Sequence, residues 1–175
     1  AVDLVPAGYT VEMGGDAVQE QFEQGATELL GVGVAAVVLV ITFGSLLAAG
    51  LPLLTAILGI GISVSAITAA SGFVDLSSST STLALMLGLA VAIDYALFIV
   101  SRYRHEIALG HEREEAAGRA LGTAGSAVVF AGLTVIIALA GLSVVGVPML
   151  TQMGLAAAFS VVVAVVMALS LLPAL

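Results

Sequence analysis

The sequence lacks cysteine and carries little charge, and both absences narrow what the protein can be. Its 175 residues include no cysteine, so disulfides, thiolate metal sites and cysteine nucleophiles are excluded. Charged residues make up 9% of the chain and hydrophobic residues 61%, whereas soluble domains carry about 25% charged residues. This composition cannot form a water-exposed globular surface, which indicates a membrane protein.

Basic residues are fewer than acidic ones and lie in one segment. The formal net charge is −8, and the four basic residues, all arginines, lie between Arg102 and Arg119. No basic stripe is long enough to follow a phosphate backbone, which argues against nucleic acid as a partner. The opening AVDLVPAGYT has neither a basic nor an apolar leader region, so this sequence is not expected to contain a signal peptide. We expect the chain to be a segment of a longer polypeptide.

Long apolar runs fill most of the chain. A membrane helix needs about 20 consecutive, mostly apolar residues, and turn signals separate five stretches of that length. The sequence therefore predicts an all-α integral membrane protein, with residues 29–175 as a five-helix transmembrane bundle. The predicted spans are 29–50, 52–72, 79–101, 121–143 and 149–172.

Residues 1–28 differ from the rest of the chain. Residues 9–13 alternate between polar and apolar side chains, a Gly14-Gly15 pair follows, and a polar helical stretch leads into the first span. This pattern predicts one strand and a connecting helix, a short α/β remnant at the C-terminal end of an extracytoplasmic domain.

Residues 102–120 contain every arginine and set the expected orientation. The positive-inside rule places this loop in the cytoplasm. Counting spans from it puts the N-terminal segment outside and the C-terminus in the cytoplasm. Tyr103 and Ile107 recur near helical spacing among the charges, so the loop is either an interfacial amphipathic helix or a solvated connector.

Small residues recur along the predicted spans at steps of three or four. Helices in lipid associate through close backbone approach, so such stripes are expected to face neighbouring helices. One stripe, on the third span, leads to Tyr95, and another lies on the fifth span. Their members are Ser81, Ala84, Gly88 and Ala92 on the third span, and Gly154, Ala157 and Ala164 on the fifth.

Asp94 is the only carboxylate or basic side chain inside the five predicted spans. Arg102 follows about 12 Å further along a helix, so Asp94 is expected near the bilayer midplane. An aspartate there costs roughly 2.5 to 3.5 kcal/mol, and such residues usually face the bundle interior and mark an ion or proton pathway. Desolvation penalises the carboxylate and favours proton binding. Asp94 is therefore predicted to carry protons from an inward-facing position.

Tyr95 is the second candidate relay residue. It is turned about 100° from Asp94 around the helix, so both can point into one interior space without touching. A phenol can donate one hydrogen bond and accept another, which suits a proton relay. A packing role for Tyr95, and a purely structural one for Asp94, are the alternatives.

Other polar residues carry weaker signals. Ser126 and Thr134 on the fourth span are candidates for relay support, although such hydroxyls often bond back to their own helix. His105 and His111 are expected to be solvated, since no metal-ligand spacing surrounds them. No nucleophile elbow, phosphate loop or HExxH motif occurs, so neither an enzyme, a bound metal nor an organic cofactor is expected.

The run GLAVAIDYALFIVSRYRHEIALG (88–110), with TAGSAVVFAGLTV after it and LLPAL at the end, resembles the MMPL family of resistance-nodulation-division exporters. The resemblance implies half of a secondary active transporter core, with residues 1–28 as the end of a porter domain. It implies that Asp94 and Tyr95 meet a Tyr and an Asp from a second half of the same polypeptide. Protons would be the coupling ion. This segment alone would then insert without transporting.

That resemblance implies export of lipids or other lipophilic molecules across a bacterial plasma membrane, driven by the proton-motive force. Ala131 departs from the family pattern, which often has serine there, and Thr134 on nearly the same face could substitute for it. Two alternatives stay open: a sterol-sensing type of lipid-responsive regulatory domain, and a proton-driven motor subunit of protein export. The sequence leaves the oligomeric state and the individual substrate open.

Overall fold

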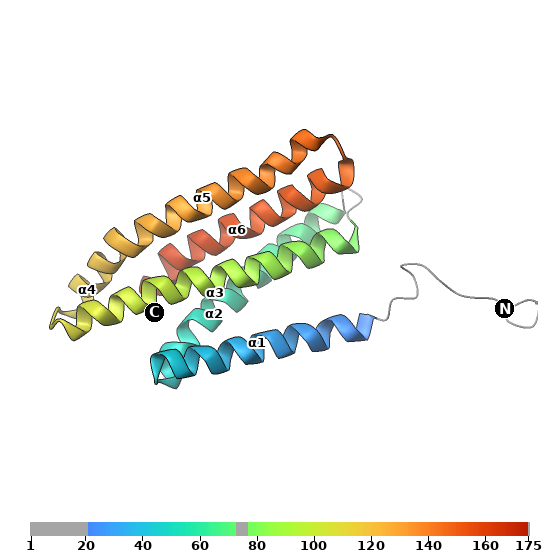
Figure 1. Cartoon of the computed structure of the whole chain (residues 1–175). Helices are drawn as coiled ribbons and strands as arrows, with labels where there is room; N and C mark the ends of the chain where they lie inside the picture. Colours follow the sequence, from blue (N-terminus) through green and yellow to red (C-terminus); the bar gives the residue numbers. More distant parts are fainter. Residues whose placement is uncertain (1–20, 73–76, 175) are drawn as a thin grey trace, which may run out of the picture. The chain divides into compact units, whose positions relative to one another are not determined.

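The computed structural model describes residues 21–72 and 77–174, and every regular element in these ranges is helical. The predicted strand at 9–13 lies outside the described residues. The chain divides into two units, residues 1–37 and 38–175, which are described separately. The elements (Figure 1) are α1 (Gln21–Phe43), α2 (Leu46–Ser71), α3 (Ser78–Ala108), α4 (Arg113–Ala120), η2 (Leu121–Gly125), α5 (Ser126–Ala140), η3 (Gly141–Val145) and α6 (Pro148–Ala174).

Within residues 21–72 and 77–174, four helical stretches are long and apolar enough to cross a membrane, which confirms an all-helical membrane architecture. They are Ala48–Ser71, Ser79–Ala108, Arg113–Val145 and Pro148–Ala174. The predicted first span, 29–50, is wrong in its extent. Helix α1 ends at Phe43, before the predicted end of the span, and the described part of its apolar stretch is Leu29–Phe43.

The chain leaves helix at Gly44, six residues before the predicted end of the first span. Gly44 has a φ of 60°, in the left-handed region, and its N–H donates to the Val40 carbonyl at 2.8 Å. Ser45 is extended and precedes the first residue of α2, Leu46. Glycine adopts this conformation at little cost, which permits a turn at this position. Because the residues on both sides are apolar, hydropathy did not predict the turn.

Pro52, which the sequence suggested as the start of the second span, lies inside α2 and is fully buried. Proline removes one helix N–H, but transmembrane helices tolerate this loss where neighbouring groups satisfy the freed carbonyls. Nearby, the Thr55 hydroxyl donates to the Pro52 carbonyl at 2.9 Å and approaches the Leu51 carbonyl at 3.1 Å. The helix therefore continues through the proline.

Helix α3 extends seven residues past the predicted span and lies at the centre of the second unit. It packs mainly against α6 and α2, while α5 packs against α6 (Figure 1). At its start the Ser77 side chain accepts from the Thr80 N–H at 3.3 Å. Its 31 residues span about 46 Å, more than the roughly 30 Å of a hydrocarbon core. One end of α3 therefore projects beyond the apolar layer.

The predicted loop 102–120 is mostly helical. Its first part belongs to α3, which ends at Ala108, and α4 begins at Arg113. Gly110, with a φ of 93°, makes the turn between them. Helix α4 continues without a break through the π-helical turn η2 into α5. The amphipathic segment around Tyr103 is thus the end of a transmembrane helix, and neither of the two predicted alternatives describes it fully.

Small residues mediate the packing of α6, as predicted. Gly88 on α3 faces Ser160 on α6, and a Cβ on Gly88 would lie 3.1 Å from the Ser160 Cβ. The stripe on α3 is buried at Ala84, Gly88 and Ala92, but Ser81 is exposed. The stripe on α6, at Gly154, Ala157 and Ala164, is buried throughout.

Candidate functional site

Asp94 lies near the middle of α3, and its side chain is exposed. The residues two positions to either side, Ala92 and Ala96, are 5% and 0% exposed, because they face the packed helices. Asp94 forms no hydrogen bond or ion pair with any residue in the described ranges. Asp94 thus points away from the packed helices of the second unit, and the prediction that it faces the interior of a complete bundle with a second half stays a prediction.

The residues around Asp94 form one continuous strip along α3. Ala90, Ser101 and His105 are exposed on the same side of the helix, as are Met86 and Phe98, which flank it. We call these residues, with Asp94, the Asp94 face. Met86 and Phe98 are 58% and 50% exposed. A single carboxylate thus lies in a face that the described helices of the second unit leave uncovered.

Tyr95 points in a different direction from Asp94. It is partly buried and packs against the core cluster that includes Ala96, Ile99 and Val128. The ring lies over Gly132 of α5, where a Cβ would sit 3.6 Å from Tyr95 Cε2. The prediction that the two side chains point into one interior space stays a prediction. A Cβ at Gly132 would overlap Val165 Cγ2, so this glycine makes room for the Val165 side chain, while the Tyr95 ring lies at ordinary contact distance.

The two predicted supporting hydroxyls both bond to their own helix. Thr134 Oγ1 donates to the Ala131 carbonyl at 2.7 Å, and Ser126 Oγ donates to the Thr123 carbonyl at 2.7 Å. Both residues are exposed on α5. The structure shows no hydrogen bond from either hydroxyl to Asp94 or Tyr95, so their role in a relay stays a prediction.

Thr134→Val in the full-length protein tests that role. If Thr134 substitutes for the serine missing at Ala131, the variant is expected to lower transport several-fold and to change its pH dependence, because valine keeps the shape but removes the hydroxyl. Thr42→Val is the matched control, since Thr42 is also exposed and also donates to its own helix, at the Val38 carbonyl. Unchanged transport at every pH would remove Thr134 from the site.

A polar network at the end of α3 was not predicted as a site. Glu106 is only 2% exposed, and its carboxylate lies 2.8 Å from Arg102 Nη2 and 3.4 Å from His111 Nε2. Arg102 Nε also donates to Thr123 Oγ1, in the π-helical turn, at 3.2 Å. His111 is therefore partly buried and paired, so the prediction of a solvated side chain is wrong for it. The i,i+4 spacing of Arg102 and Glu106 was the available signal.

This network ties the end of α3 to the start of the next membrane-spanning segment. Thr123 receives the Arg102 hydrogen bond and itself donates to the Arg119 carbonyl at 2.8 Å. π-Helical turns occur frequently at functional sites. The TAG residues 123–125, singled out by the sequence, occupy this turn. A side-chain hydrogen bond thus joins the end of α3 to the segment that leads into α5.

Within the described residues, the arrangement places an ionisable carboxylate in the middle of an apolar helix. It provides one carboxylate on an exposed face, a tyrosine beside it and a long helix anchored by polar bonds at one end. A carboxylate exposed to lipid is unfavourable, so the Asp94 face requires a further protein surface or a water-filled path. Either would let the carboxylate exchange a proton.

Comparison with known proteins gives a consistent result. The model of the MMPL family matches residues 1–175. The chain is 49% identical over 168 residues to the membrane protein YdfJ of Bacillus subtilis, covering 95% of this chain and 23% of that protein. It is 36% identical to the mycolic acid-containing lipids exporter MmpL11 of Mycolicibacterium smegmatis, covering 85% of this chain and 16% of that protein.

A putative membrane protein of Streptomyces coelicolor is 43% identical over 161 residues, covering 92% of this chain and 23% of that protein. The chain thus spans less than a quarter of the length of these relatives. The similarity covers this part of the relatives only.

Proposed function

The chain belongs to the MMPL family, and on this basis we propose that it supplies one half of the proton-relay bundle of a lipid exporter. The exporter is a secondary active transporter that exchanges protons for lipids or other lipophilic molecules across the bacterial plasma membrane. Asp94 takes up and releases the proton, and Tyr95 passes it on. No organic cofactor or metal takes part, and protons are the coupling ion.

The position of Asp94 on an uncovered face carries this proposal. A carboxylate near the middle of a membrane helix is stabilised by partners or water, not by lipid. The chain itself provides no such partner within the described residues. We infer that a second transmembrane half of the same polypeptide covers the Asp94 face and brings its own tyrosine to Asp94 and its own carboxylate to Tyr95.

The direction of transport follows from the distribution of charge. The arginines and the end of α6 meet at one end of the second unit, because Arg104 and Arg113 line the same pocket as Leu172 and Pro173. The positive-inside rule assigns this end to the cytoplasm. We propose that α1 is a further crossing, which places the N-terminal segment outside. Protons then enter through the outer side and leave toward the arginine-rich end.

Lipid as the substrate class is supported by the relatives. One is named as an exporter of mycolic acid-containing lipids, and another, from Mycobacterium tuberculosis, as an exporter of trehalose monomycolate. Moving one proton across 100 mV releases about 2.3 kcal/mol. This free energy is sufficient to bias a conformational equilibrium by nearly fiftyfold per proton.

Transport in liposomes that contain the full-length protein tests the proposed function. Lipid movement out of the cytoplasmic-side leaflet is expected to require an imposed pH gradient and to stop when a protonophore is added. Movement that continues unchanged with the protonophore would contradict proton coupling. Tight lipid binding with no proton-dependent movement would instead favour a lipid-responsive regulatory domain.

A further inference from the structure

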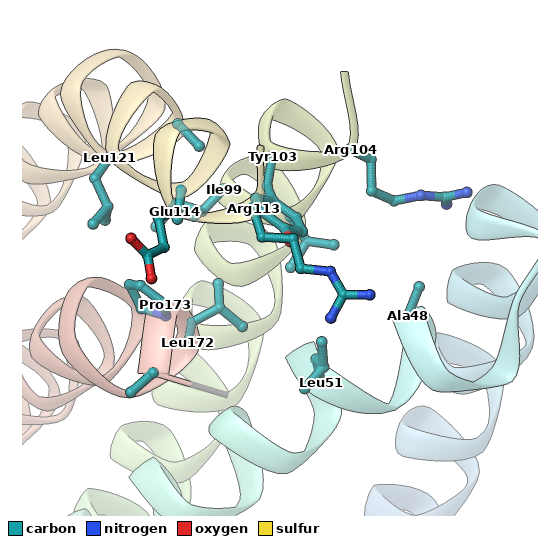
Figure 2. Close-up of a pocket in the computed structure, with 14 residues that line it drawn as sticks. Ala48, Leu51, Ile99, Tyr103, Arg104, Arg113, Glu114, Leu121, Leu172 and Pro173 are labelled. Carbon is teal, nitrogen blue, oxygen red and sulfur yellow. The ribbon is translucent and has the colours of Figure 1, made fainter. Parts of the chain in front are cut away.

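A pocket of about 630 Å³ lies at the arginine-rich end of the second unit (Figure 2). The start of α2, the end of α3, helix α4 and the end of α6 form its walls. Its volume falls within the range of about 300 to 1,000 Å³ typical of small-molecule sites. The pocket is separate from Asp94, and the proposed proton relay makes no use of it.

The pocket has an apolar part and a cationic part. Leu51, Ile99 and Leu172 contribute aliphatic side chains, whereas Arg104 and Arg113 contribute guanidinium groups. Figure 2 shows the Arg113 guanidinium extending toward Leu51 and Ala48. This combination suits an amphipathic ligand that has an anionic head and an apolar tail.

The two arginines in the pocket are the two without acidic partners among the described residues. Arg102 is paired with Glu106 and Arg119 with Glu115, each at 2.8 Å. Arg113 forms no hydrogen bond or ion pair with any described residue. Both arginines without an acidic partner therefore lie at the pocket.

Arg104 is held in place by a different kind of partner. Its Nη1 donates to the Phe43 carbonyl at 2.6 Å, and its guanidinium lies 5.3 Å from the centre of the Phe43 ring. A carbonyl and an aromatic ring fix the group without neutralising it. Arg104 therefore keeps its full charge and further N–H donors, and a planar guanidinium can bind phosphate through two parallel hydrogen bonds.

One acid, Glu114, also lines the pocket. Its carboxylate forms no ion pair with Arg104 or Arg113, and Figure 2 shows it directed toward Pro173, away from the Arg113 guanidinium. With two arginines and one glutamate, the ionisable groups at the pocket carry a net charge of about +1 at neutral pH. The pocket thus favours an anion at its arginine side.

The depth of the pocket matches the boundary between hydrocarbon and headgroups. Ile99 lies about 7.5 Å and Arg104 about 15 Å beyond Asp94 along α3. The half-thickness of the hydrocarbon core is also about 15 Å. Tyr103 lines the pocket at the same level, and tyrosine is enriched at this interface. The apolar residues are therefore at acyl-chain depth and the arginines at phosphate depth.

We propose that this pocket binds one phospholipid with an anionic headgroup, taken from the adjacent leaflet. The lipid phosphate contacts Arg113 and Arg104, and the first part of an acyl chain lies against Leu51, Ile99 and Leu172. Bound between α2, α3, α4 and α6, the lipid stabilises the junction between α3 and the next span. The proposal requires that these helices lie in a membrane, and it does not require proton-driven export.

Native mass spectrometry of the full-length protein tests the proposal without a proton gradient, so its outcome is independent of export. The protein is titrated with phosphatidylglycerol or with phosphatidylcholine carrying the same acyl chains. We expect stronger retention of phosphatidylglycerol, and Arg113→Gln should weaken it about fivefold, the effect of one arginine near an anionic lipid surface. Arg119→Gln is the matched control, because it removes the same charge from the same helix outside the pocket.

A second variant, Ala117→Phe, tests the apolar part. Ala117 lines the pocket, so a phenylalanine there is expected to occupy the acyl-chain space and to lower retention of phosphatidylglycerol as well. Thermal unfolding and helix content confirm that each variant is folded. Equal retention of the two lipids by the wild type, or equal losses in Arg113→Gln and Arg119→Gln, would overturn the proposal. The proposal would also be overturned if glycerol phosphate bound as tightly as the lipid and this binding depended on Arg113.

Discussion

Asp94→Asn in the full-length protein is expected to abolish proton-driven export while leaving insertion and abundance near normal. Asparagine has the size of aspartate but does not bind and release a proton in this pH range. Loss of a group that transfers protons typically costs a hundredfold or more, so export should fall by at least about that factor. Export of a lipid by cells that express the variant measures the effect.

Glu112→Gln provides the control for Asp94→Asn. Glu112 is an exposed acid that precedes α4, and its side chain forms no capping hydrogen bond. Its replacement removes the same charge outside the predicted spans, so export should remain near the wild-type level. Export by Asp94→Asn that stays sensitive to a protonophore, at close to the wild-type rate, would show that another group carries the proton.

Gly154→Ala is expected to have the largest effect on stability. A Cβ at Gly154 would overlap the Leu139 backbone carbonyl oxygen and lie 2.9 Å from the Leu142 Cβ. Because a backbone atom cannot rotate away as a side chain can, α6 must move away from the segment that contains α5 and η3. Overpacking of this kind costs about 1 to 3 kcal/mol, and occasionally more. Unfolding of the full-length protein in mixed detergent micelles measures the loss.

Gly118→Ala is the matched control for this substitution. Gly118 lies in the middle of α4, and a Cβ there has no atom within 4 Å. Alanine favours helix over glycine by about 0.8 to 1 kcal/mol, so this variant should be slightly more stable than the wild type. If Gly154→Ala were as stable as Gly118→Ala, the close contact between α6 and Leu139 would be wrong.

Hydropathy predicted most of the membrane-spanning segments but misplaced the first boundary. The spans at 52–72, 79–101, 121–143 and 149–172 correspond to helical stretches of the structure. The error at 29–50 has one cause: Gly44 breaks the helix through its backbone conformation, and hydropathy does not register φ. At Pro52 the sequence predicted a helix boundary that the structure lacks, because a proline is typical of helix ends but lies inside α2 here.

The sequence identified Asp94 as an anomaly of charge but not the direction in which its side chain points. An acid in an apolar run is expected to face the packed interior. In this bundle the packed side of α3 is defined by Ala92 and Ala96, and Asp94 lies about 200° from each of them around the helix. The expectation of an inward side chain concerned a complete transporter with a second half, and it is the packed side of α3 within the second unit that excludes Asp94.

The Glu106 network escaped prediction because its partners come from separate elements. Arg102 and Glu106 could be paired from their spacing along α3, but His111 follows a turn and Thr123 lies in η2. Contacts of this kind depend on how α4 folds back on α3. The pocket beside them depends likewise on the end of α6, which lies some 60 residues further along the chain.

Proton entry into liposomes containing the full-length protein tests the role of Asp94 most directly. A pH-sensitive dye inside the liposomes reports the flux after a pH gradient is imposed, with the lipid substrate present in the bilayer. The wild type is expected to admit protons well above the rate of protein-free liposomes, and Asp94→Asn to admit them no faster than these. Equal proton entry through the wild type and Asp94→Asn would contradict the assignment of Asp94 as the proton carrier.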